Sequence, residues 1–385
     1  MQITVLAGLN SKFGELWDIS PRDLVKEVFH GTLKNSNMNK NDIDVVFVGN
    51  MLAGTLGGQN HLGAFFAEEL GLERPAIRVE GACCSGGLAV HSAVLGISSG
   101  IYQTALVIGV EKMTDHKPEK VAEALMGAGS DLERDAGASF PALYALIARA
   151  HMEKYGTSEE EMAAVAVKNH YHASLNSHAQ FRNPISIEKV LKSPMIASPL
   201  KLLDCSPISD GASALILSSK SKALSLKKDD PGVNIVSSVV ATDTLGLSER
   251  KDLTTLNAVV TASCKAYKMA NIDPGDIDVA EVHDCFTIAE IIAMEDLGFF
   301  PRGQAGKAIL EGKTRLGGRP VVNTSGGLKA AGHPVGATGV KQIVEIYQQL
   351  MGVSGKKQVK NAKIGLTHNV GGSGATAVIH ILKRG

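Results

Sequence analysis

The chain contains an internal duplication, which restricts it to folds built from two similar halves. Residues 25–45 combine an amphipathic helical pattern, a polar turn and the tetrapeptide Asp-Ile-Asp-Val, and residues 259–279 repeat this order. The segment 65–71, Phe-Phe-Ala-Glu-Glu-Leu-Gly, has a counterpart at 291–298. Because helical patterns alternate with buried apolar strands, the sequence predicts an α/β fold with largely parallel sheets flanked by helices.

The duplication also relates two glycine-containing turns. The turn and helix at 83–99 correspond to the turn and helix at 332–350, and a strand follows each of them. If the halves pack about a pseudo-twofold axis, both helix N-termini open onto one pocket. His333 is then a candidate base for Cys83. Read without this symmetry, His333 is a surface histidine in a glycine-rich loop.

The turn around Cys83 has the composition of a nucleophile site. A short strand, predicted to be buried, spans 76–80, a helix runs on from Gly86, and Gly-Ala-Cys-Cys-Ser-Gly-Gly lies between them. The free N–H groups and positive end of a helix favour a thiolate at such a turn. The alternative is that Cys83 and Cys84 are inert small residues that let the helix pack closely on a sheet.

Residues 113–209 depart from the repeat, and we expect this excursion from the first half to cover the pocket. Helices are predicted at 138–155 and 158–174, the second with acidic residues in its first turn. A return strand is expected at 210–217 and a linker at 218–231. A metal site is not expected here, because positions i and i+2 of a helix face different ways and no Cys or carboxylate completes a set with His170, His172 and His178.

Composition and charge exclude several classes of protein. The 385 residues are 44% hydrophobic, enough for a large core, and 39 basic residues balance 39 acidic ones, so nothing points to nucleic acid or an acidic membrane surface. From the apolar pattern and the residues at the N-terminus, neither a signal peptide nor a membrane-spanning stretch is expected. Five cysteines do not form a disulfide framework. A reducing, cytoplasmic setting is therefore expected.

Four motifs, in their order and spacing, resemble the active-site motifs of the thiolase superfamily. The second motif has His-Asp-Cys-Phe where biosynthetic thiolases have Asn-Glu-Ala-Phe, and the fourth has Asn where they have Cys. This form, with the segments 323–328 and 199–214, is similar to the sterol-carrier-protein type and its archaeal acetoacetyl-CoA thiolase relatives. The motifs are Cys83-Cys84-Ser85-Gly86, His283-Asp284-Cys285-Phe286, Gly332-His333-Pro334 and His368-Asn369-Val370-Gly371.

The resemblance implies a duplicated thiolase fold of two similar half-domains in a five-layered αβαβα arrangement, with an added loop domain. It places the N-terminal half at 1–117 and 206–228 and the C-terminal half at 229–385. The loop excursion between them, 118–205, is expected to cover bound coenzyme A.

The resemblance also implies covalent acyl transfer. Cys83 would be the nucleophile that takes an acyl group from acyl-CoA, with His333 activating its thiolate. Cys84 fills a variable position and is expected to be structural. A base must then take an α-proton from a second acetyl-CoA, and Asn369, in the place of the usual Cys, cannot accept it. Cys285 is the expected replacement, although the same residue is otherwise a core cysteine.

Further site residues follow from the same resemblance. His333, with a group or water oriented by His283, would stabilise the enolate, and the backbone N–H groups of Cys83 and Gly371 would form a second oxyanion hole. Asn369 either contacts substrate or supports its loop. Ser206 matches a position that contacts the pantetheine arm, or is a turn serine before proline. The glycines at 371–374 lack the following Lys-Ser/Thr of a phosphate loop.

The expected activity is that of an acetyl-CoA C-acetyltransferase, a reversible Claisen condensation of two acetyl-CoA to acetoacetyl-CoA and CoA. Lipid metabolism, through the mevalonate pathway, is the expected setting. The alternatives are a ketoacyl synthase-like condensing enzyme that uses Cys83, His333 and Asn369, and a scaffold or lipid-handling subunit without turnover. No cofactor or metal is implied. The expected partners are acyl-CoA and CoA, further copies in a homodimer or homotetramer, a hydroxymethylglutaryl-CoA synthase and a small zinc-ribbon/OB-fold protein.

Overall fold

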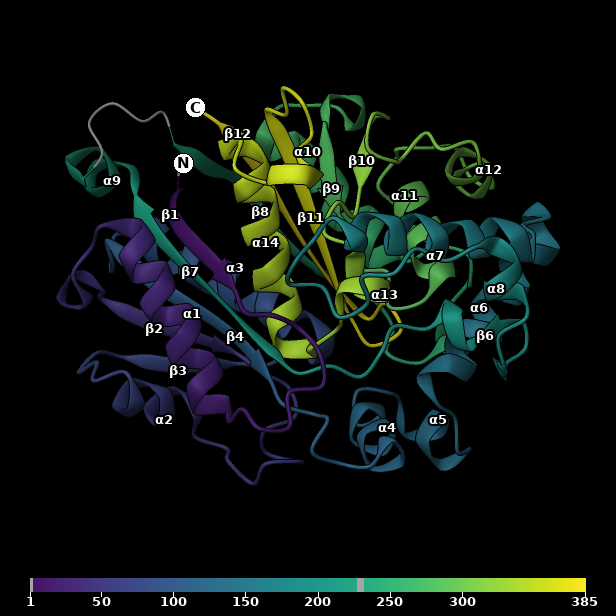
Figure 1. Ribbon diagram of the computed structural model, residues 1–385, viewed down its shortest axis with the longest axis horizontal. Helices are drawn as coiled ribbons and strands as arrows, with labels where there is room; N and C mark the ends of the chain where they lie inside the picture. Colours follow the sequence, from purple (N-terminus) through teal and green to yellow (C-terminus); the bar gives the residue numbers. More distant parts are fainter. Residues whose placement is uncertain (1–2, 227–231) are drawn as a thin grey trace.

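Ten strands form one continuous sheet whose order is symmetric about its centre (Figure 1). The computed structural model describes residues 3–226 and 232–385. In the order β10-β9-β11-β12-β8-β1-β7-β4-β2-β3, each strand of one half occupies the mirror position of its counterpart. The first half supplies β1 (Ile3–Asn10), β2 (Val45–Gly49), β3 (Ala76–Val79), β4 (Thr104–Glu111) and β7 (Gly211–Ser219). The second supplies β8 (Val233–Thr242), β9 (Val279–Glu281), β10 (Val321–Val322), β11 (Ile364–Gly371) and β12 (Thr376–Arg384).

The strand directions correct the expectation of largely parallel sheets. Within the described residues, parallel pairing is confined to β2 with β3 and β4, and to β9 with β10 and β11. The inner strands pair antiparallel, and β1 and β8 join the halves through three residue pairs. The physical reason is visible at β11 and β12, where a short turn at 372–375 forces neighbouring strands to run in opposite directions.

The helices complete five layers, which confirms the predicted fold class. The outer face of the first half carries α1 (Pro21–Ser36) and α2 (Leu62–Glu69), and that of the second carries α10 (Asn257–Ala270) and α11 (Thr287–Asp296). Two helices, α3 (Ser85–Ser98) and α14 (Val335–Met351), lie between the two half-sheets and contact both. Figure 1 shows α14 between the purple first half and the green second half.

Alternation along β4 shows how the sequence specifies these layers. Leu106 and Ile108 pack in the outer core with α1, whereas Ala105 and Val107 pack in the central core with α3 and α14. Successive strand residues point to opposite faces of a sheet, so a strand buried on both faces reads as a continuous apolar run.

The repeated helix–turn–strand units match in detail and confirm the duplication. The helices α1 and α10 both end at an Asn in the left-handed conformation, Asn37 with φ 56° and Asn271 with φ 50°. Each is followed by a 3-10 turn with a capping box, Lys40–Asp42 and Pro274–Asp276. Asn tolerates this conformation better than other residues with a side chain, so both helices stop at equivalent places.

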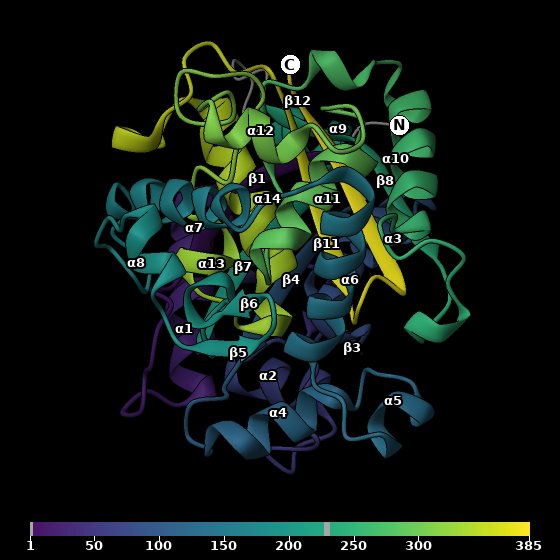
Figure 2. The ribbon, with the colours of Figure 1, turned by 90° about the vertical axis from the view of Figure 1, so that its right-hand side faces the viewer.

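The excursion carries α4 (Pro118–Met126), α5 (Asp131–Asp135), α6 (Phe140–Tyr155), α7 (Glu159–Ser174), α8 (Ile187–Leu191) and the hairpin of β5 (Met195–Ala197) and β6 (Leu200–Lys201). The helices predicted at 138–155 and 158–174 are α6 and α7, with Ser139 and Ser158 as side-chain caps. Figure 2 shows α4 and α5 at one end of the molecule, below the sheet. The remaining helices are α9 (Lys220–Leu226), α12 (Ala305–Leu310) and α13 (Gly327–Ala331).

The strand predicted at 76–80 and the linker predicted at 218–231 differ in part from the structure. The strand expected to be buried at 76–80 is β3, which is partly exposed because it is the edge strand and pairs only with β2. The expected linker begins within β7 and α9, and its remainder, with the predicted domain boundary at 228/229, falls at residues 227–231, outside the described residues. None of the helices in the described ranges is long and apolar enough to cross a membrane.

The N-termini of α3 and α14 meet through glycines. A Cβ on Gly339 would lie 2.1 Å from the Gly87 nitrogen, and one on Gly86 would lie 2.7 Å from the Gly336 oxygen. Distances this short exclude any side chain, so the two backbones are in direct contact. The turns that precede the two helices are thereby brought to the same place.

Candidate active site

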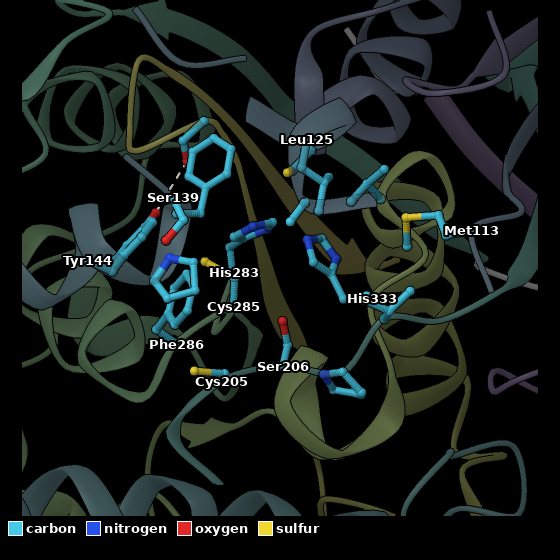
Figure 3. A pocket seen from close by; sticks show the side chains of 18 residues that line it. Met113, Leu125, Ser139, Tyr144, Cys205, Ser206, His283, Cys285, Phe286 and His333 are labelled. Atoms are coloured by element: carbon cyan, nitrogen blue, oxygen red, sulfur yellow. Dashed lines mark hydrogen bonds between the residues drawn. The ribbon is translucent and has the colours of Figure 1, made fainter. Parts of the chain in front are cut away.

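A cavity of about 200 Å³ lies where the two halves and the excursion meet (Figure 3). The predicted residues Cys83, His283, Cys285, His333 and Ser206 all line it. Most of the remaining wall is apolar and comes from the excursion and the second motif: Met113, Ala122, Leu125, Ser139, Phe140, Pro141, Tyr144, Cys205, Pro207, Ile208, Phe286, Val335 and Gly372. The expected convergence of both halves on one pocket is therefore confirmed.

Cys83 lies in a 3-10 turn, Ala82–Cys84, directly before α3. The turn is tight enough to hold Ala82 at φ 54°, a conformation that costs a non-glycine residue free energy and recurs at functional sites. Burial raises the pKa of the Cys83 thiol to about 12, while a hydrogen bond from the Gly372 backbone N–H opposes the rise. The resting nucleophile is a neutral thiol, so an adjacent base has to remove its proton.

Cys84 faces away from the cavity. Its buried thiol donates to the Gly81 carbonyl at 2.8 Å, and burial raises its pKa strongly. This placement agrees with the structural role expected for it.

The hydrogen bonds of His333 determine where its proton lies. Its Nδ1 is 2.8 Å from the Thr338 hydroxyl, and that hydroxyl donates to the Pro334 carbonyl at 3.0 Å. Because the hydroxyl hydrogen is already used, Nδ1 must be the donor and Nε2 carries a free lone pair. Burial lowers the pKa of His333 to about 3, so the ring is neutral. His333 therefore offers a proton acceptor to the pocket.

Asn369 imposes the opposite arrangement on His283. The Gly87 N–H donates to Asn369 Oδ1 at 3.1 Å, which turns Nδ2 toward the Cys83 carbonyl and His283 Nδ1, both at 3.2 Å. An amide nitrogen only donates, so His283 Nδ1 accepts and Nε2 carries the hydrogen. Burial, with the nearby His333, lowers the pKa of His283 well below its usual value. His283 is thus a neutral donor.

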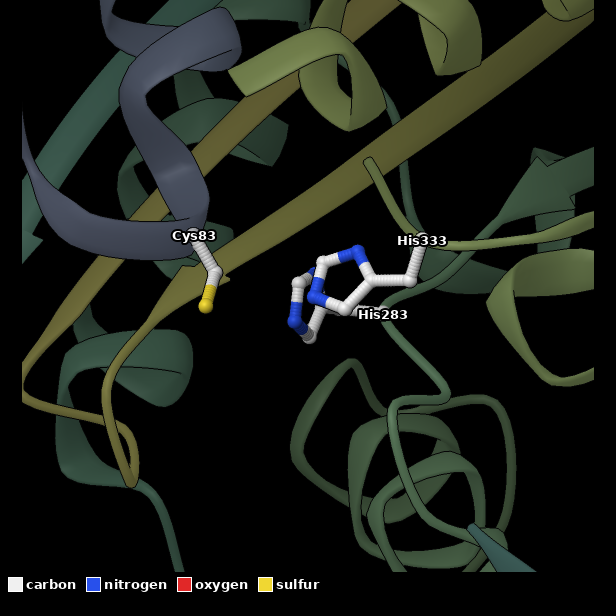
Figure 4. A group of neighbouring side chains, drawn as sticks. All are labelled: Cys83, His283 and His333. Carbon is white, nitrogen blue, oxygen red and sulfur yellow. The ribbon is translucent and has the colours of Figure 1, made fainter. Parts of the chain in front are cut away.

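The three side chains form a compact group (Figure 4). The sulfur of Cys83 and one ring nitrogen each of His283 and His333 lie within 4.8 Å of one another, and the two rings meet edge-on with centroids 5.0 Å apart. Sulfur and imidazole are zinc ligands. His283 could bind a metal through Nε2 only by losing the hydrogen that its bond with Asn369 keeps there, so this donor set fits a metal poorly.

Cys285 lines the cavity, and the residue before it, Asp284, is buried and anchored by hydrogen bonds. The Asp284 carboxylate accepts the backbone N–H of Leu328 at 2.6 Å and the Asn169 amide at 2.6 Å. Burial and the neighbouring Cys83 raise the pKa of the Cys285 thiol far above its usual value, and a hydrogen bond with the Tyr144 hydroxyl opposes the rise. Cys285 is therefore also a neutral thiol.

Glu111 ties the two halves together behind the cysteine. Its carboxylate accepts the backbone N–H of Leu52 at 3.1 Å from the first half and of Gly336 at 3.0 Å from the second. Burial raises the pKa of Glu111 to about 7. The position of the α14 N-terminus, and with it His333, depends on this contact.

Several residues differ from expectation or were missed. Cys205, which belongs to none of the four motifs, lines the cavity next to Ser206, whose backbone N–H donates to the Cys285 carbonyl at 2.9 Å. At the fourth motif the cavity is lined by Gly372, while Gly371 ends β11 and packs against Gly81. Tyr144 and Thr338 belong to no motif, and only the three-dimensional contacts reveal them. His170, His172 and His178 bond to three separate backbone carbonyls.

Comparison with solved structures assigns the fold. A chain of the Ltp2-ChsH2(DUF35) aldolase superimposes with a TM-score of 0.83 at 23% identity, covering 98% of this chain and 97% of the other. The acetyl-CoA acetyltransferase of Syntrophomonas wolfei gives a TM-score of 0.77 at 20% identity, covering 100% and 99%. At these identities the likeness concerns architecture, and it defines the chain as a thiolase-fold protein.

Sequence comparison identifies the family. The family models described as "Thiolase, N-terminal domain" and "Thiolase C-terminal domain-like" match residues 3–221 and 240–384. An acetyl-CoA acetyltransferase of Methanothermobacter thermautotrophicus is 46% identical over 383 residues, 99% of both chains, and sterol carrier protein 2 of Bos taurus is 33% identical, over 92% of this chain and 67% of the relative. The chain belongs to the thiolase family, as the four motifs predicted.

Proposed function

We propose that this protein is an acetyl-CoA C-acetyltransferase that reversibly condenses two acetyl-CoA to acetoacetyl-CoA and CoA. The observation that carries the proposal is the meeting of two thiols, Cys83 and Cys285, with a neutral acceptor, His333, and a neutral donor, His283, in one buried cavity. The acetyl-CoA acetyltransferase names of the relatives at 46% identity support this reaction.

The first half-reaction loads the enzyme. His333 Nε2 takes the proton of Cys83, and the sulfur attacks the thioester carbonyl of acetyl-CoA. The tetrahedral intermediate collapses, the C–S bond to CoA breaks, and Cys285 gives its proton to the leaving CoA thiolate. The products are CoA, an acetyl group on Cys83, an imidazolium at His333 and a thiolate at Cys285.

The second half-reaction forms the carbon–carbon bond. The Cys285 thiolate takes an α-proton from a second acetyl-CoA, and the enolate carbon attacks the acetyl carbonyl on Cys83. The C–S bond to Cys83 breaks, and its thiolate recovers the proton from His333. All groups return to their initial protonation states, so the cycle balances and runs in both directions.

Two sets of hydrogen-bond donors stabilise the negative charges that develop on the enolate and on the tetrahedral intermediate. We assign His283 Nε2–H and the imidazolium of His333 to the enolate oxygen, which refines the expected role of His283 from orienting a water to direct donation. The backbone N–H of Cys83 and an amide of the 371–372 segment serve the tetrahedral intermediate. Gly372 lines the cavity and donates toward Cys83, which favours it over Gly371. Asn369 supports both sets by fixing the His283 ring.

The proposal extends to partners and setting. Ser206 is assigned to the pantetheine arm of CoA because it lies on the cavity wall beside Cys285. The same proposal includes assembly as a homodimer or homotetramer and association with a hydroxymethylglutaryl-CoA synthase and a zinc-ribbon/OB-fold protein. It also includes a cytoplasmic role in lipid metabolism through the mevalonate pathway. One structural neighbour, the Ltp2-ChsH2(DUF35) aldolase, is itself described with a second protein.

The function is tested by mixing the wild-type protein with acetoacetyl-CoA and a trace of CoA and measuring intact mass and product. We expect one acetyl group per chain and, when CoA is in excess, steady release of acetyl-CoA. A protein that neither becomes acetylated nor forms acetyl-CoA would reject the proposal in favour of a non-catalytic subunit.

The tautomers of the two pocket histidines give an independent prediction. With ring nitrogens labelled by ¹⁵N, we expect His333 to carry its hydrogen on Nδ1 and His283 on Nε2 at pH 7, because their partners Thr338 and Asn369 impose opposite roles. His283→Gln and His333→Gln each remove one signal and so assign the spectrum. Identical tautomers at the two rings, or an imidazolium at either, would contradict the prediction.

A further inference from the structure

Tyr144 is a buried tyrosine that lines the cavity without belonging to any motif. It lies in the first half of α6 and is among the largest fully buried side chains, with 2% of its surface exposed. Its ring packs against Phe286, the residue after Cys285, with centroids 4.6 Å apart. The ring is thereby fixed, and its hydroxyl is held at a defined place on the cavity wall (Figure 3).

The hydroxyl has one hydrogen and can direct it to either of two groups. It donates to the Gly372 carbonyl at 3.4 Å, and the Cys285 thiol lines the same cavity. The bond to Gly372 is long and hence weak. Donation to a sulfur that becomes negatively charged is far stronger than donation to a neutral carbonyl. The hydrogen is therefore free to turn from Gly372 to Cys285 when Cys285 ionises.

The groups around Tyr144 and Cys285 favour this turn of the hydroxyl hydrogen toward the thiolate. Cys83 and Asp284 raise the pKa of Cys285, whereas the Tyr144 hydroxyl favours its thiolate. His283 and His333 line the same cavity, and in the proposed mechanism the His333 imidazolium is present at the same stage as the thiolate. Arg250 places its positive charge near Tyr144, which opposes the rise in the pKa of the phenol and makes the hydroxyl a better donor. Arg250 also donates to the Ser373 carbonyl at 2.7 Å and so anchors the turn that carries Gly372.

We propose that Tyr144 is a positioning residue that donates its hydroxyl hydrogen to the Cys285 thiolate in the interval between the two half-reactions. This inference rests on the proposed function, in which Cys285 is ionised only while Cys83 carries the acetyl group. No proton leaves Tyr144; its hydrogen bond turns from Gly372 to the thiolate sulfur and returns when Cys285 is protonated again. Tyr144 thus stabilises the base at the one stage at which it must be charged.

The test compares Tyr144→Phe with wild type in the washout of deuterium from the methyl group of acetyl-CoA, followed against pH. Loss of a hydrogen bond to a charged group lowers the exchange rate at neutral pH about 10-fold to 100-fold. Removing a donor destabilises the thiolate, so the pKa that governs exchange moves upward by about one unit for each tenfold loss. The phenylalanine ring retains the contact with Phe286.

Tyr267→Phe is the matched control, because it also removes a buried hydroxyl that donates to a carbonyl, at Leu297 and 2.8 Å, but in α10 outside the cavity. We expect it to leave exchange and its pH profile unchanged. A Tyr144→Phe profile that superimposes on that of wild type, or a loss matched by Tyr267→Phe, would overturn the inference.

Cys285→Ala separates this inference from the proposed function. Exchange that survives in Cys285→Ala rejects Cys285 as the base and the proposed mechanism with it. Exchange that is lost in Cys285→Ala but unchanged in Tyr144→Phe rejects only the role of Tyr144.

Discussion

Replacement of Cys83 by alanine is expected to abolish the acetyl-enzyme and to reduce turnover by at least about 10,000-fold, because the alanine offers no atom to carry the acyl group. The side chain is partly buried at the start of α3, and the change to alanine keeps the turn conformation. Intact-protein mass after mixing with acetoacetyl-CoA measures the adduct, and release of acetyl-CoA measures turnover.

Cys264→Ala is the control for this substitution. Cys264 is an exposed free thiol in α10, away from the cavity, and its removal is expected to leave both adduct and turnover unchanged. Acetylation that persists in Cys83→Ala at the wild-type level would move the nucleophile to another thiol, and loss of acetylation in Cys264→Ala would do the same.

Cys285→Ala is expected to reduce turnover about 1,000-fold to 10,000-fold while acetyl-CoA still acetylates Cys83. The CoA thiolate is a good enough leaving group to depart without an acid, whereas the α-proton of the second acetyl-CoA is not lost without the base. The acyl-enzyme should accumulate, since the enolate of the second acetyl-CoA forms too slowly to consume it. Mass measurement of the adduct and deuterium washout from acetyl-CoA report the two steps separately.

The same variant tests the condensing-enzyme alternative. A synthase-like site that uses Cys83, His333 and Asn369 does not need a second thiol, so Cys285→Ala would then retain full turnover. The geometry argues for the two-thiol mechanism, because the Asn369 amide is engaged by Gly87, Cys83 and His283 and serves as a support.

The duplication was visible in the sequence because it repeats local signals. A polar turn after an amphipathic helix, then Asp-Ile-Asp-Val, marks the same helix end and strand start in both halves, and the left-handed Asn37 and Asn271 show why. Such signals depend on neighbours within a few residues. The helices of the excursion also begin at local signals, since the structure places caps at Ser139 and Ser158.

Strand direction was less predictable. The apolar runs that become β7 and β12 are buried on both faces, and this pattern is typical of parallel strands. Their antiparallel pairing follows from where the connections return the chain, which a hydrophobic pattern does not record. The exposure of β3 is likewise a matter of its place at the sheet edge.

The order and spacing of residues were sufficient to predict the family, the two-half architecture and five of the residues that line the cavity, since motif glycines, thiols and imidazoles are read one position at a time. The tertiary structure alone decided the proton positions on His283 and His333, the place of Gly372 beside Cys83, and the place of Tyr144 in the same cavity as Cys285. These depend on contacts that the folded chain makes, such as the one between Asn369 and His283, or on burial that changes the charge of a group. Both arise only when the two halves and the excursion close on one another.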